Sequence, residues 1–249
     1  MERFIKDPHN YTYAQLQNND WDILETNITV DVDAFKEWSD TVQEKFSDCG
    51  FNFIEHMHLL KPAVRERKDF FYSDAFLVRN ADQFRQWTLQ WSYQRDGAIP
   101  LLQIADIEQF PEGADPNELK KVFNINLEKY YFGMYKKYQE ALGDDVFKVT
   151  RLVRFGKDNG LRVHTDNGPD EPNLIRMHLQ IEVNPSAWIK FGENLDRSYT
   201  PEVGKVYFYN TSVHHSAMNE ANTPWTFLHN DPLPESIDKL LQTKIHIGK

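Results

Sequence analysis

Residues 176–183 read Arg-Met-His-Leu-Gln-Ile-Glu-Val, and this stretch indicates the fold class. Polar and apolar residues alternate strictly along it, which is the period of a β-strand with two unlike faces. The polar face is expected to carry Arg176, His178, Gln180 and Glu182, and the apolar face Met177, Leu179, Ile181 and Val183. Polar side chains are costly in a dry, unpaired interior. The pattern therefore favours a wet, ligand-binding interior, with an ordinary solvent-facing surface as the alternative.

The pattern of the chain changes near Val146. After this residue the spacing of apolar residues is that of short strands, with residues 204–209 as a second clear example and turn residues at 167–169 and 184–185. Short strands at regular spacing are typical of a jelly-roll, whose open mouth can hold a metal. We therefore expect residues 146–249 to form a double-stranded β-helix (jelly-roll, cupin-like) core.

Residues 1–145 are expected to form a mainly helical region packed on that core, giving an α+β protein that is one compact unit. Three stretches have helical spacing: residues 33–48, residues 81–94, and a stretch from a cap at Asp115 to Gly143. The inward residues of the first two are expected to be Phe35, Trp38, Val42 and Phe46, and Phe84, Trp87 and Trp91.

Composition excludes several classes of function. The 249 residues carry a formal net charge of −10, which argues against nucleic acid or an anionic membrane as the main partner. Cys49 is the single cysteine, so neither a disulfide framework nor a cysteine-based zinc site is expected. The first residues lack an apolar signal region and no run is long enough to span a membrane. We expect a cytoplasmic protein, with a homodimer as a possible assembly.

The sequence His164-Thr165-Asp166 and the later pair His214-His215 suggest a metal site. On an extended segment, residues two apart project from the same face, so His164 and Asp166 could hold one ion. Two imidazoles and one carboxylate form the facial triad of non-haem iron(II) oxygenases. Chance remains an alternative, because His-x-Asp is common and nine histidines make a second histidine nearly inevitable.

Four motifs occur in an order that resembles a known family. They are His-Thr-Asp at 164–166, Leu-Ile-Arg-Met-His-Leu at 174–179, Gly-Lys-Val-Tyr-Phe at 204–208 and Ser-Val-His-His-Ser-Ala at 212–217. Over about residues 150–231 the chain resembles the aspartyl/asparaginyl β-hydroxylase-like iron(II)/2-oxoglutarate dioxygenases, especially the proline cis-4-hydroxylase branch. The resemblance implies that His164, Asp166 and His215 bind iron, His215 being preferred to His214 because it immediately precedes Ser-Ala.

The same resemblance implies further roles. Arg176 and His178 match family residues that hold carboxylates of cosubstrate or substrate. One position departs from the family pattern: ten residues after the distal histidine, where the family has an arginine for the far carboxylate of 2-oxoglutarate, stands Trp225. Indole has one donor and no charge, so it cannot replace a guanidinium. We expect Trp225 to line the pocket and Arg154 to supply the cation, with Arg151 and Arg162 as further candidates.

The sequence thus predicts an iron(II)- and 2-oxoglutarate-dependent dioxygenase that uses O2 to hydroxylate an unactivated C–H bond. The expected substrate is a small molecule, namely an amino acid or an amino-acid derivative. Two alternatives stay open: a cupin-like metalloenzyme that does not use 2-oxoglutarate, which the missing arginine favours, and a non-catalytic jelly-roll binding protein.

Overall fold

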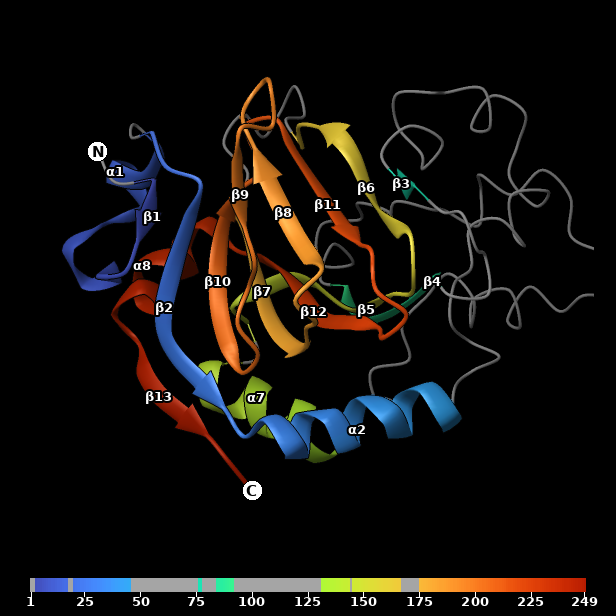
Figure 1. Cartoon of the computed structure of the whole chain (residues 1–249). Coiled ribbons are helices and arrows are strands. Elements are labelled where there is room, and N and C mark those ends of the chain that lie inside the picture. Colours follow the sequence, from blue (N-terminus) through green and yellow to red (C-terminus); the bar gives the residue numbers. More distant parts are fainter. Residues whose placement is uncertain are drawn as a thin grey trace, which may run out of the picture.

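The strands of this protein form two sheets (Figure 1). The computed structural model describes residues 3–17, 20–45, 131–143, 145–166 and 175–249, and the backbone alone of 76–77 and 84–91. The larger sheet has the order β1-β2-β10-β7-β12-β5-β4, with β13 also paired to β2, and the smaller sheet has the order β3-β6-β11-β8-β9. The strands are β1 (Phe4–Ile5), β2 (Ile23–Val30), β3 (Phe76–Leu77), β4 (Phe84–Trp91), β5 (Phe147–Phe155), β6 (Asn159–His164), β7 (Ile175–Glu182), β8 (Ala187–Phe191), β9 (Arg197–Tyr199), β10 (Lys205–Asn210), β11 (His215–Asn219), β12 (Trp225–Pro232) and β13 (Lys244–Ile247).

The order of the strands is that of a double-stranded β-helix. From β5 to β12 the chain passes back and forth between the sheets: β5, β7, β10 and β12 lie side by side in the larger sheet, and β6, β8, β9 and β11 in the smaller one. Both groups pair antiparallel, as in a jelly-roll. The predicted fold class is therefore confirmed. β1 and β13 pair parallel to β2, so segments near both ends of the described chain extend the larger sheet at one edge.

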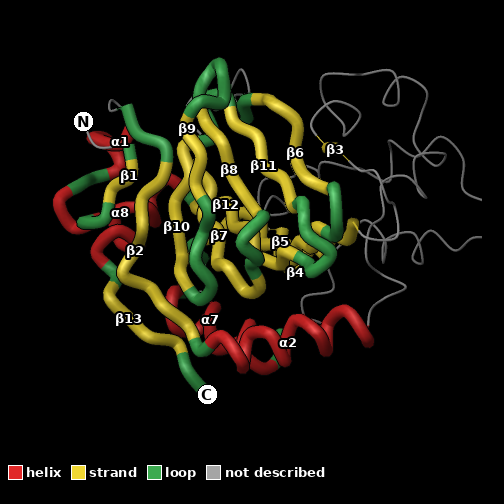
Figure 2. Tube along the Cα trace, viewed as in Figure 1, coloured by secondary structure: helices red, strands yellow, loops and turns green. Residues whose placement is uncertain are grey.

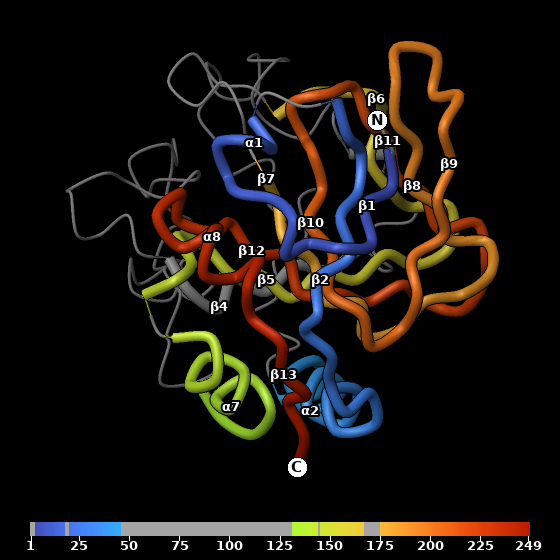
Figure 3. The backbone as a smooth tube through the Cα atoms, turned by 90° about the vertical axis from the view of Figure 1, so that its left-hand side faces the viewer, coloured from blue at the N-terminus to red at the C-terminus, as the bar shows by residue number. Residues whose placement is uncertain are grey.

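The helices cover the face of the larger sheet that points away from the smaller sheet (Figures 2 and 3). They are a 3-10 turn η1 (Pro8–Asn10) and the helices α1 (Tyr13–Gln17), α2 (Val32–Lys45), α7 (Gly133–Leu142) and α8 (Pro234–Gln242). One core packs these helices on the outer face of the larger sheet, and a second core fills the space between the two sheets. None of the described helices is long and apolar enough to cross a membrane.

The first predicted helix is confirmed as α2. Asp31 caps it, because its carboxylate accepts a hydrogen bond from the backbone N–H of Ala34 at 3.0 Å. Three of the residues expected to face inward are buried, namely Phe35, Trp38 and Val42, and the fourth, Phe46, lies outside the described residues.

One helix prediction within residues 1–145 is wrong, and another is tested only at its end. Residues 84–91, within the stretch expected to be a helix, form strand β4, which pairs with β5. Their aromatic residues suit a strand as well as a helix, because aromatic side chains are enriched on pleated surfaces. The last predicted helix, from Asp115 to Gly143, is confirmed over its end as α7, with an interruption just before it because Phe132 is extended; residues 115–130 lie outside the described residues. The described part of this region therefore contains strands of both sheets as well as helices.

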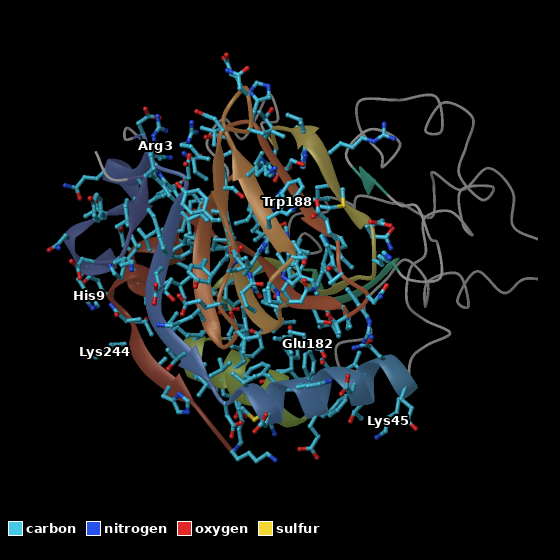
Figure 4. All side chains as sticks on the ribbon, in the orientation of Figure 1. Arg3, His9, Lys45, Glu182, Trp188 and Lys244 are labelled. Atoms are coloured by element: carbon cyan, nitrogen blue, oxygen red, sulfur yellow. The ribbon has the colours of Figure 1, made fainter. Side chains whose placement is uncertain are left out.

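Strand β7 confirms the predicted faces of residues 176–181, but Glu182 and Val183 lie on the faces opposite to those expected, since Val183 packs against the core between the sheets. A register shift between β7 and β12 opposes Thr226 to Glu182 but Phe227 to Gln180, which adds one residue on β7 and turns Glu182 to the other face. There Glu182 accepts a hydrogen bond from Thr226 at 2.7 Å and forms an ion pair with Lys36 of α2 at 2.9 Å. Figure 4 accordingly shows Glu182 next to α2. Arg176, His178 and Gln180 remain on the inner face, between the sheets.

Strands β6 and β11 approach each other very closely at Gly160. A Cβ atom built at this residue would lie 2.0 Å from the carbonyl oxygen of Ala217 on β11. A side chain here would therefore push the two strands apart, and these strands carry His164 and His215, two of the three candidate metal ligands.

We expect Gly160→Ala to lower the free energy of unfolding by about 1–3 kcal/mol, because the added methyl overpacks this strand pair. Urea denaturation measures the change. Gly248→Ala is the matched control, since its added Cβ would meet no atom closer than 3.6 Å. Equal stabilities of the Gly160→Ala and Gly248→Ala proteins would contradict the close approach.

Candidate metal centre

The structure brings His164, Asp166 and His215 together. His164 ends β6, and it lies directly opposite His215, the first residue of β11, with 4.2 Å between the ring centroids. Two residues beyond His164, the backbone N–H of Asp166 donates to the carbonyl oxygen of Thr211 at 2.9 Å, which holds this residue beside the strand pair. One ligand atom from each of the three side chains lies within 4.8 Å of the others. The predicted metal ligands therefore converge.

Both imidazoles are oriented by the backbone two residues earlier. Nδ1 of His164 lies 2.6 Å from the carbonyl oxygen of Arg162, and Nδ1 of His215 lies 3.0 Å from that of Val213. A carbonyl oxygen only accepts, so each Nδ1 carries the proton and donates it. Each neutral ring is left with its lone pair on Nε2. Such contacts fix the tautomer of metal-binding histidines in general.

The charges around the triad favour a bound cation. Burial opposes ionisation of Asp166, but the guanidinium of Arg176, at 3.3 Å, and the His164 ring hold its pKa well below the usual range. Burial also opposes protonation of His164, yet the Asp166 carboxylate, 3.4 Å from Nε2, raises its pKa. Uptake of a proton at Nε2 would place that proton between the His164 ring and the Asp166 carboxylate, where a metal cation would compete with it.

The third ligand remains neutral under ordinary conditions. Burial lowers the pKa of His215 to about 4, although the Asp166 carboxylate partly offsets this effect. Solvent still reaches the site, because the side chain of His164 is 19% exposed and that of Asp166 is 22% exposed. Asp166 is therefore ionised and His215 neutral, as metal ligation requires.

Next to the triad, four side chains are linked in a row by ion pairs and hydrogen bonds, and we call this row the inner polar chain: Arg176, Asp231, His229 and His178. Arg176 forms ion pairs with both Asp166 and Asp231. Asp231 lies 2.8 Å from Nε2 of His229, whose Nδ1 lies 3.0 Å from Nε2 of His178. The inner polar chain links the metal triad to the middle of the inner face of β7 and β12.

The two members of the inner polar chain on β12 were not predicted from the sequence. His229 and Asp231 repeat the His-x-Asp spacing of 164–166, and with Phe227 they continue the alternation of the inner face of β12. That repeated spacing is the signal that could have identified them.

The structure separates the other predicted residues. His214 is exposed, whereas His215 is buried and points towards His164 and Asp166, as expected. Arg154 does not face the site: it donates to Gln43 of α2, on the outer face of the larger sheet. Arg162 is exposed. Arg151, by contrast, lies on β5 opposite His229, on the inner face, where its charge contributes to lowering the pKa values of His229 and Asp231.

Trp225 lies at the inner end of the same face and is buried. Its indole N–H donates to the side-chain oxygen of Gln180 at 2.8 Å, and its ring packs against Phe155 and Phe227. It therefore belongs to the core between the sheets.

Comparisons with known proteins leave the family open. No family model and no curated protein matches the chain. Among solved structures, a Pseudomonas putida prolyl-4-hydroxylase matches at 9% identity and a TM-score of 0.41, covering 88% of this chain and 97% of its own. A 2OG-Fe(II) oxygenase family oxidoreductase from Burkholderia pseudomallei matches at 11% identity and a TM-score of 0.35, covering 61% of this chain and 66% of its own. A cupin domain from Bordetella pertussis matches at 13% identity and a TM-score of 0.28, covering 34% of this chain and 80% of its own. At these values the likenesses carry no functional argument.

We expect His164→Ala, Asp166→Ala and His215→Ala each to weaken divalent-metal binding by more than about tenfold, because each removes one donor of the triad. Anaerobic titration with Co(II), followed by its visible absorption, measures the affinity. His214→Ala is the matched control, since it deletes the adjacent, exposed histidine and should bind as the unaltered protein does. A loss of affinity in His214→Ala alone would contradict the assignment.

Proposed function

We propose that this protein is a non-haem iron(II) oxygenase that uses 2-oxoglutarate and O2 to hydroxylate an unactivated C–H bond of an amino acid or an amino-acid-derived small molecule. The observation that carries the proposal is the convergence of His164, Asp166 and His215, with both imidazoles held so that Nε2 is the free donor.

The donor set fits iron(II). Two imidazole nitrogens and one carboxylate form the facial triad, which leaves the remaining coordination positions open. Bound there, iron(II) would supply the activation of O2, whereas the protein supplies ligation, orientation and shielding from water. The tasks of the chain are thus to hold the ligands at fixed tautomers and to keep Asp166 ionised, which Arg176 does.

The charge at the site suits an anionic cosubstrate. Asp166 and Asp231 carry one negative charge each, and Arg176 and Arg151 one positive charge each, so these four groups sum to zero. A divalent cation would leave an excess of two positive charges in a partly buried place, where unbalanced charge is costly. 2-Oxoglutarate is a dianion and would balance this excess.

The residue that we assign to the far carboxylate is Arg151. The strand register arranges the inner face of the larger sheet in layers, and one layer holds His178, His229 and Arg151. On the paired strands β12 and β5, Trp225 lies opposite Phe155. This pair is two inward-facing positions further from the triad than Arg151. The layer of Arg151 is thus adjacent to the layer of Arg176, and the Arg151 side chain is the cation that it places on the inner face. Arg151 is also nearer to the metal triad than position 225 is.

A second candidate function is a cupin-like metalloenzyme that does not use 2-oxoglutarate. The observation that favours it is Trp225, a buried indole bonded to Gln180 at the place where the family has its arginine. A non-catalytic binding protein is the third possibility, and the absence of metal binding would favour it.

Addition of 2-oxoglutarate to the anaerobic iron(II)-loaded protein should produce a visible charge-transfer band, because the keto acid would chelate the metal. Iron that binds without such a band would rule out the 2-oxoglutarate reading and favour the second candidate. A screen of amino acids and small peptides for succinate release under O2 would then identify the substrate class.

In the same assay, Arg151→Ala should weaken 2-oxoglutarate binding by about tenfold or more, since a charge-assisted hydrogen bond to a carboxylate is lost. Arg154→Ala is the matched control, because it removes the same side chain from the same strand but from the outer face. Iron affinity should stay unchanged in both variants. If Arg154→Ala weakens cosubstrate binding and Arg151→Ala does not, the assignment is wrong.

A further inference from the structure

We propose that His178 presents the lone pair of its Nδ1 to the bound ligand and therefore recognises a hydrogen-bond donor there, a hydroxyl or an amino group, rather than a carboxylate. The proposal deepens the proposed function, since it rests on the metal site as the place where the ligand binds. It departs from the role in carboxylate binding that the sequence resemblance implies for this residue. It follows from the direction of each hydrogen bond in the inner polar chain.

The direction is set at Asp231. Burial opposes ionisation of this carboxylate, but the Arg176 guanidinium, with which it forms an ion pair, holds its pKa far below the usual range. An ionised carboxylate only accepts hydrogen bonds. Nε2 of His229, at 2.8 Å, must therefore carry the proton of that contact.

The next contact follows from the first. Burial keeps the pKa of His229 below its ordinary value, so the ring is neutral at pH 7 and has one N–H. That N–H is Nε2, which leaves a lone pair on Nδ1. His178 must then donate from its Nε2 across the 3.0 Å contact.

His178 is left with a lone pair on Nδ1. Burial and the neighbouring His229 ring hold the pKa of His178 well below its usual value, so a second proton is disfavoured. This Nδ1 is inaccessible to solvent and has no hydrogen-bond partner in the part of the chain that the structure describes. Buried polar atoms are nearly always satisfied, so an orphaned acceptor indicates a missing donor.

The surroundings of the ring place this acceptor on the ligand side of the sheet. His178 lies on the inner face of β7, with its ring 4.7 Å from that of Tyr209 and 4.8 Å from that of Phe227. A carboxylate brought to Nδ1 would set lone pair against lone pair. A hydroxyl or an amine would supply the proton, and the two aromatic rings would contact the carbon atoms next to it.

The first test measures the tautomer in the metal-free, unaltered protein. Long-range nitrogen–proton correlation spectra of histidine-labelled protein distinguish a protonated from an unprotonated ring nitrogen. The His178→Leu protein assigns the resonances of His178, and His246→Leu, which alters a histidine on β13, serves as the assignment control. We expect a protonated Nε2 and an unprotonated Nδ1 in His178. A protonated Nδ1 would overturn the proposal.

The second test uses paired probes with the Zn(II)-loaded protein. The ω-hydroxy acids of two to six carbons are each compared with the dicarboxylate of the same length, so that one carboxylate can reach the metal and only the far group differs. In His178→Leu, at least one hydroxy acid should bind about three- to tenfold more weakly, as expected for one hydrogen bond. Every dicarboxylate, and 2-oxoglutarate, should bind as to the unaltered protein.

Weaker binding of a dicarboxylate or of 2-oxoglutarate to His178→Leu would overturn the proposal, as would unchanged binding of every hydroxy acid. The two proposals can fail separately. If Zn(II) does not bind, or if 2-oxoglutarate does not, the proposed function fails in that respect. The tautomer of His178, measured without metal, then still decides which group this residue can recognise.

Discussion

The guanidinium of Arg176 is the group on which the arrangement of the site depends. It lies between two carboxylates, that of Asp166 in the metal triad and that of Asp231 in the inner polar chain. Isolated buried charges are costly, and removing one partner of such an ion pair leaves an uncompensated charge behind. Arg176 therefore keeps Asp166 ionised, as a candidate metal ligand must be, and Asp231 ionised as a hydrogen-bond acceptor. Through Asp231 it also fixes which nitrogen of His229 and of His178 carries a proton.

The triad depends on the backbone as well. His164 and His215 oppose each other because β6 and β11 pair in one register, and Gly160 allows these strands to approach closely. Each ring is then held through Nδ1 by a carbonyl two residues earlier, in its own strand or at the approach to it. The ligand geometry thus follows from strand pairing and does not require the metal to create it, which is the preorganisation that a functional site needs.

The sequence predicted the parts of the site that strand alternation determines. His164 and Asp166 are two residues apart, Arg176 and His178 likewise, and a period of two places each pair on one face. Alternation also separated His215 from His214. It could not predict Glu182, because a register shift adds a residue to β7 and turns that side chain outward. Nor could it orient Arg154, since no pattern in the sequence determines which face of β5 points inward.

Trp225 limits how far a ligand can extend. Its indole, Phe155 and Phe227 fill the inner end of the space between the sheets, and Gln180 satisfies the one indole donor. The polar inner face of β12 and β5 therefore ends at the layer of His229 and Arg151. Successive inner positions on a strand are only about 7 Å apart. A ligand that reaches both the triad and this layer thus needs only a few carbon atoms. A tryptophan at position 225 is therefore compatible with the short cosubstrate that we propose, provided that its far carboxylate is bound by a cation nearer to the triad.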